Sequence, residues 1–119
     1  MVIDIMTWLG EQCTAIAALE AKAAAQISAG DSTAYRATMQ EKATLLAGLA
    51  MRAEPALASC PEEKRNAIRS QLNNFSASAQ NALSIGSVFY MSALLYPDEH
   101  KAGQPNNLEL YRDTLAKTL

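Results

Sequence analysis

The sequence predicts an all-α protein, an elongated up-down-up three-helix bundle followed by a short C-terminal amphipathic helix. Its 119 residues include 23 Ala, the strongest helix former, but only eight Val and Ile, too few for a sheet of several strands. Apolar residues recur at alternating spacings of three and four along three long stretches, which is typical of helices in a bundle. We expect a single domain, because a chain of this length can bury a stable core without disulfide bonds or bound metal ions.

The first helix is expected over about residues 3–29. Gly30 can adopt the left-handed conformation that often follows a helix, and Asp31 or Ser32 can cap the next one. A joint this tight predicts an antiparallel helical hairpin. The apolar stripe of this helix is Met6, Leu9, Cys13, Ile16, Glu20, Ala23 and Ile27.

The second helix is expected over about residues 32–58, with a kink near Pro55, which lacks an amide hydrogen, or an early stop near Glu54. Its stripe contains Lys42, as the first contains Glu20. These two residues lie twelve and ten positions from Gly30, so we expect them to pair across the hairpin at the edge of the core. The alternative is that each side chain extends separately to water.

The third helix is expected to be the longest, over about residues 61–96, and to end at Pro97. A loop over 97–106 follows. A short helix over about 107–118 completes the bundle, with Asn106 or Asn107 as its cap. Helices of this length predict a molecule roughly 40 to 50 Å long.

Several classes of function are disfavoured by composition. The net charge of −2 argues against duplex DNA as a partner, because non-specific DNA affinity needs a dense basic face. The one histidine, His100, falls in the predicted loop, so a site with two imidazole ligands is excluded. No glycine-rich phosphate loop or nucleophile motif occurs. We therefore expect no enzyme activity, no metal and no cofactor.

The sequence also predicts a cytoplasmic protein without membrane insertion. No basic segment precedes an apolar run at the N-terminus, and no apolar stretch approaches 18 uncharged residues. Cys13 and Cys60 lack the spacing of metal ligands, and we interpret them as small apolar helix residues rather than as a disulfide.

A candidate partner-binding surface lies in the last third of the chain. Residues 85–96 are apolar on more than one face of the predicted helix, since Ile85 and Tyr90 widen its stripe. Either residues 108–119 and the N-terminal turn cover this segment, or it receives a partner helix or a second copy. Both hold if the C-terminal segment is a displaceable plug. The candidate residues are Val88, Phe89, Met91, Leu94, Leu95, Tyr96, Leu108, Tyr111 and Leu115.

The middle of the chain resembles flagellar export chaperones of the FlgN type. The resemblance is carried by the Gly-Asp joint within 29–35, the Lys-Ala-Thr-Leu-Leu run within 41–49, and Arg52. The family's third helix is rich in Asn and small residues, and here that helix contains Asn73, Asn74 and Asn81. The family's Asn-x-x-Asn-Gly element is not reproduced, because Ala82 follows Asn81.

This resemblance implies a small cytoplasmic chaperone without a cofactor, which binds hook–filament junction proteins through its C-terminal helical portion. The leading hypothesis is thus a protein-binding module that captures amphipathic helices of its client. The alternative is a helical structural module that self-associates, as a homodimer, through the same surface. A ligand pocket between the helices is the third and least supported reading.

Overall fold

Residues 4–95 and 105–118, the part of the chain that this computed structural model describes, form seven helices and no strand. Four of the helices are long and three are short. The molecule measures 47 × 30 × 29 Å along its principal axes. The helices are α1 (Ile5–Ser28), α2 (Ser32–Ala47), α3 (Leu49–Arg52), α4 (Glu54–Leu57), α5 (Glu62–Ile85), α6 (Val88–Ala93) and α7 (Asn107–Thr118).

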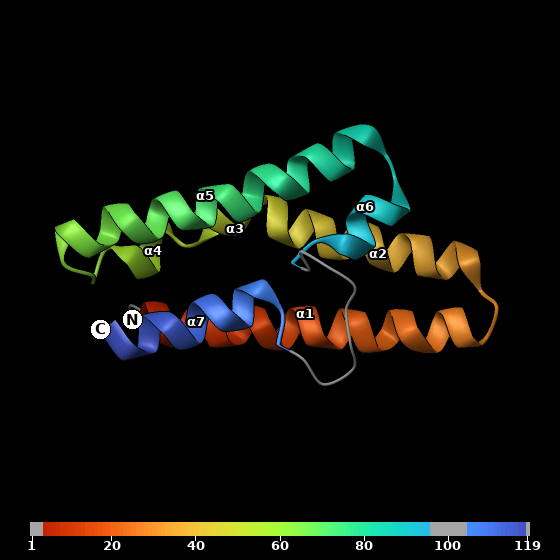
Figure 1. Ribbon diagram of the computed structural model, residues 1–119, viewed down its shortest axis with the longest axis horizontal. Helices are drawn as coiled ribbons and strands as arrows, with labels where there is room; N and C mark the ends of the chain where they lie inside the picture. Colours follow the sequence, from red (N-terminus) through yellow and green to blue (C-terminus); the bar gives the residue numbers. More distant parts are fainter. Residues whose placement is uncertain (1–3, 96–104, 119) are drawn as a thin grey trace.

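The predicted hairpin of the first two long helices is confirmed, and its chemistry is local. Asp4 caps α1 by accepting a hydrogen bond from the Thr7 amide at 2.9 Å. Gly30 takes a φ of 75° after α1 ends, and Asp31 caps α2 through the Ala34 amide at 3.1 Å. α1 and α2 then pack side by side in opposite directions (Figure 1).

The second predicted helix is not continuous, which corrects the expectation of one helix with a kink near Pro55. α2 ends before Gly48, and the chain continues as the two single-turn helices α3 and α4. Pro55 lies in the first turn of α4, where a missing amide hydrogen is tolerated. Ser76 of α5 satisfies the backbone at the break: its hydroxyl donates to the Leu46 carbonyl at 3.0 Å and accepts from the Ala50 amide at 3.1 Å.

The third predicted helix is also interrupted, since α5 ends at Ile85 and does not run on to residue 96. Gly86 adopts the left-handed conformation with a φ of 75°, and the chain turns back into α6. The apolar stripe of α5 faces the core as predicted up to this point, with Leu72 and Ala79 fully buried. Beyond Gly86 the stripe no longer predicts which side chains are covered.

The C-terminal helix α7 begins with a reciprocal cap. The Asn106 side chain accepts from the Glu109 amide at 2.9 Å, and the Glu109 carboxylate accepts from the Asn106 amide at 3.0 Å. α7 runs antiparallel beside the N-terminal half of α1 (Figure 1). The arrangement is therefore not simply a three-helix bundle, because α7 adds a fourth long helix and α6 folds over α2.

The core consists mainly of Leu, Ile and Ala side chains from α1, α2 and α5. Leu9 and Ile16 of α1 are fully buried, as is Leu46 of α2. Cys13 and Cys60 are both buried and free, in agreement with their interpretation as small apolar residues. No helix in the described ranges is long and apolar enough to cross a lipid bilayer.

Candidate functional site

The α5–α6 corner carries three large apolar side chains that are exposed to solvent, whereas Leu110, which is 49% exposed, lies on α7. Ile85 is 54% exposed, Phe89 74% and Tyr90 52%. The Phe89 and Tyr90 rings meet edge to face, with centroids 5.7 Å apart. We call Ile85, Phe89 and Tyr90 the corner patch. Two exposed aromatic rings in contact, with an exposed Ile at the preceding helix end, are what a protein-binding surface offers.

Among the described residues, the structure exposes only one of the predicted partner-binding residues fully. Phe89 is exposed, whereas Val88 and Tyr111 are half-buried. Tyr96 lies outside the described residues. The other five candidates are core residues in this structure and are not available to a partner on its surface: Met91, Leu94, Leu95, Leu108 and Leu115.

In the described residues, α6 is packed against elements other than the predicted C-terminal helix. α6 packs on α2 and α5, whereas α7 packs on α1. The α7 ring of Tyr111 faces Phe75 of α5, with centroids 6.2 Å apart. The Asn107 amide at the start of α7 donates a hydrogen bond to the Leu95 carbonyl at 2.9 Å. α7 therefore does not cover the corner patch.

Two residues of the corner patch, Ile85 and Tyr90, were not among the predicted site residues. The apolar spacing of the sequence places both on the widened apolar stripe of one continuous helix over residues 61–96. The signal that could have found them is Gly86, which can end a helix in the left-handed conformation. A helix that ends there leaves Ile85 at the end of α5 and presents Tyr90 from a separate helix.

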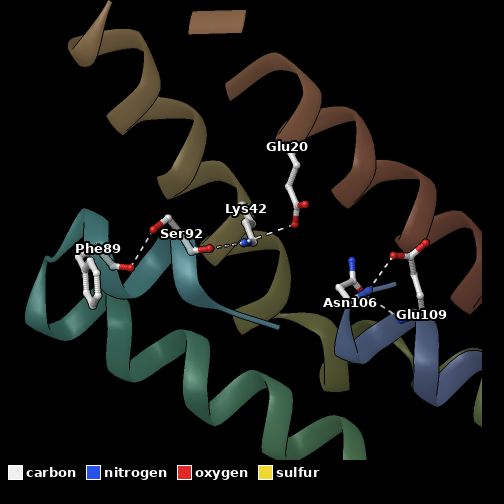
Figure 2. A network of polar contacts seen from close by, with 6 residues as sticks. All are labelled: Glu20, Lys42, Phe89, Ser92, Asn106 and Glu109. Atoms are coloured by element: carbon white, nitrogen blue, oxygen red, sulfur yellow. Dashed lines mark hydrogen bonds and ion pairs between the residues drawn. The ribbon is translucent and has the colours of Figure 1, made fainter. Parts of the chain in front are cut away.

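A buried ion pair lies beside α6, where α1, α2 and α6 meet (Figure 2). The Lys42 ammonium is 3.4 Å from a Glu20 carboxylate oxygen and donates to the Ser92 carbonyl at 3.1 Å. The predicted pairing of Glu20 and Lys42 is confirmed. Its location is not at the edge of the core, however, because the Lys42 side chain is only 1% exposed.

This environment acts on the titration of Lys42. Burial lowers the pKa of the Lys42 ammonium from its usual 10.5, because the charged form loses hydration. The Glu20 carboxylate opposes part of this shift by stabilising the charge. The Glu20 side chain is itself 24% exposed, so the pair joins a buried cation to an anion with access to water.

An open groove of about 250 Å³ runs beside the ion pair between α1, α2 and α6. That volume is below the range of about 300 to 1,000 Å³ usual for small-molecule sites. Apolar side chains predominate in its walls, and its charged groups already contact one another. The lining residues are Glu20, Ala23, Ala24, Ile27, Tyr35, Met39, Lys42 and Ser92.

A wider and shallower groove of about 790 Å³ follows the outer face of α2 and ends at Arg52. The Arg52 guanidinium donates to the Gln12 side chain at 2.9 Å and to the Leu45 carbonyl at 2.7 Å. It also lies over the Trp8 ring, 5.8 Å from the centroid. Arg52 thus links α3 to α1 and to the end of α2, which is a structural role.

The described residues contain no group of three or more His, Cys, Asp or Glu side chains that could hold a metal ion. The fold and the surface define an all-α protein with an apolar corner and a buried ion pair beside it. Comparisons with family models, with curated protein sequences and with solved structures gave no match to this chain.

Proposed function

We propose that this protein is a protein-binding helical module that captures an amphipathic helix of a protein client at the corner patch. The observation that supports the proposal is that half of the six large apolar side chains exposed in the described residues belong to the corner patch. The other three, Ile27, Met51 and Leu110, lie singly on α1, α3 and α7. Aromatic side chains contribute much of the energy of protein interfaces, because each buries a large apolar area.

The resemblance to FlgN-type chaperones supplies the class of client. Within this proposal the client is a hook–filament junction protein bound in the cytoplasm before export. The corner patch lies in the C-terminal third of the chain, which is the portion that the resemblance implies for client binding. No cofactor is required for such a role.

The proposal is tested by binding of fluorescent peptides that cover the amphipathic helices of a hook–filament junction protein. Phe89→Asp should weaken binding about 10- to 100-fold, since burial of a Phe side chain contributes about 1.5 to 3 kcal/mol. Met51→Asp is the matched control, because Met51 is 76% exposed on α3, outside the corner patch. Binding by none of the peptides, or equal losses in both variants, would contradict the proposal.

The alternative is self-association through the corner patch. Light scattering after size-exclusion chromatography distinguishes the two functions. A dimer that Phe89→Asp converts to a monomer, together with no peptide binding, would favour a self-associating structural module. Leu95 is unsuitable for this test, because it is buried and its φ is 75°, so a charge there would disturb the fold.

A further inference from the structure

The short helix α6 carries two of the three residues of the corner patch. It contains six residues, and an isolated helix of that length is not stable in water. Its position therefore depends on contacts with the rest of the protein. Met91 supplies one of these contacts, because its side chain is buried.

Apolar contacts hold α6 against the core, but because the hydrophobic effect is not directional they do not by themselves fix the orientation of the helix. Ser87 caps the start of the helix through a long hydrogen bond of 3.4 Å from the Tyr90 amide. The end of α6 is held differently, because the Ser92 carbonyl accepts a hydrogen bond from the buried Lys42 ammonium. A cation is stabilised at this location, since the last carbonyls of a helix carry partial negative charge.

Lys42 also connects α6 to the first hairpin. The residue belongs to α2, its ammonium contacts Glu20 of α1, and its hydrogen bond reaches α6 (Figure 2). The Phe89 ring lies on the side of α6 away from this ion pair (Figure 2). One charged group thus joins three helices and lies opposite the exposed ring.

We infer that Lys42 is a positioning residue: its ammonium fixes α6 on the α1–α2 hairpin and thereby sets the direction in which Phe89 and Tyr90 face. The effect on α6 is independent of what the protein binds. The effect on client binding rests on the function proposed above. Lys42 touches no client itself in this arrangement, since its side chain is only 1% exposed.

The test is amide hydrogen exchange in Lys42→Met, which keeps much of the side-chain volume and removes the charge. Exchange of the Met91 and Leu94 amides, which bond within α6, should accelerate about tenfold or more relative to amides of α5. Lys64→Met is the matched control. Lys64 also donates to a carbonyl at a helix end, that of Thr118 in α7, so its replacement should leave exchange in α6 unchanged.

Acceleration in α6 of less than about twofold in Lys42→Met would overturn the inference. If Lys42→Met does not fold, the double variant with Glu20→Gln removes both charges and is compared in the same way. Failure of both variants to fold would also overturn the inference, because Lys42 would then hold the whole bundle and not α6 in particular.

Peptide binding separates this inference from the proposed function. If Phe89→Asp binds as tightly as the wild type, the proposed function fails, whatever α6 does in the exchange experiment. If Phe89→Asp loses binding, Lys42→Met should lose about tenfold through the mobility of α6. Wild-type binding by Lys42→Met in that case would refute the positioning role.

Discussion

Replacement of Ser76 by Ala tests the explanation of the break at Gly48. The Ser76 hydroxyl makes two buried hydrogen bonds with the backbone on either side of the break, at 3.0 Å to the Leu46 carbonyl and 3.1 Å from the Ala50 amide. Alanine would remove the hydroxyl that serves both groups and leave the Ala50 amide as a buried donor without a partner, whereas the Leu46 carbonyl would keep the Gly48 amide. An unsatisfied buried group costs about 1 to 3 kcal/mol, and the higher helix propensity of Ala offsets about 0.5 kcal/mol.

We therefore expect Ser76→Ala to lower the free energy of unfolding by about 2 kcal/mol, which is roughly a 30-fold change in the unfolding equilibrium. For 119 residues this corresponds to a decrease in Tm of about 8 °C. Urea denaturation followed by Trp8 fluorescence measures the change. Ser70→Ala is the control, since Ser70 is exposed on the same helix. A difference between the two variants below about 0.5 kcal/mol would refute the bridging role.

Three further predictions concern backbone, charge and thiols. Gly86→Ala should destabilise the fold by about 1 kcal/mol, because the φ of Gly86 is 75°, a conformation that costs energy for a residue with a Cβ atom. Gly10→Ala should stabilise the fold by a similar amount, because Gly10 lies inside α1 with open space around its Cα, and thermal unfolding measures both changes. The pKa of Lys42 is lower in the folded protein than in the unfolded chain, so the unfolded chain binds more protons between the lowered pKa and about 10.5. Across that window, urea denaturation should show the free energy of unfolding of the wild type increasing with pH relative to that of Lys42→Met. Burial raises the pKa of the Cys13 thiol, whereas the Arg112 charge of α7 lowers it by a smaller amount. Removal of α7 ends both effects and uncovers the thiol, so alkylation of Cys13 should accelerate at least about tenfold relative to Cys60, as peptide mass spectrometry would show.

The parts of the fold that were predictable from the sequence depend on local chemistry. The joint at Gly30 and Asp31 was predictable because one residue takes the left-handed conformation and the next caps the following helix. The breaks at Gly48 and Gly86 were not predicted, since the apolar spacing continues across both. Whether a glycine ends a helix depends on partners from elsewhere, such as the hydroxyl of Ser76 at the first break.

The candidate site shows the same division. The pairing of Glu20 with Lys42 followed from their comparable distances from the turn, but the burial of Lys42 did not, because α6 folds back over it. Phe89 was predicted to continue the core stripe of a long helix. The turn at Gly86 changes the direction of the chain, so Phe89 is exposed while Met91 is buried.

The packing of α7 on α1 has a consequence for synthesis of the protein. Translation produces α1 first and α7 last, with about 90 residues between their ends, which takes on the order of ten seconds at 5 to 20 residues per second. During that interval the α1 surface around Cys13 lacks its cover. On the ribosome, the face of α1 that α7 later covers is therefore exposed to mispairing or to a holding chaperone throughout this interval.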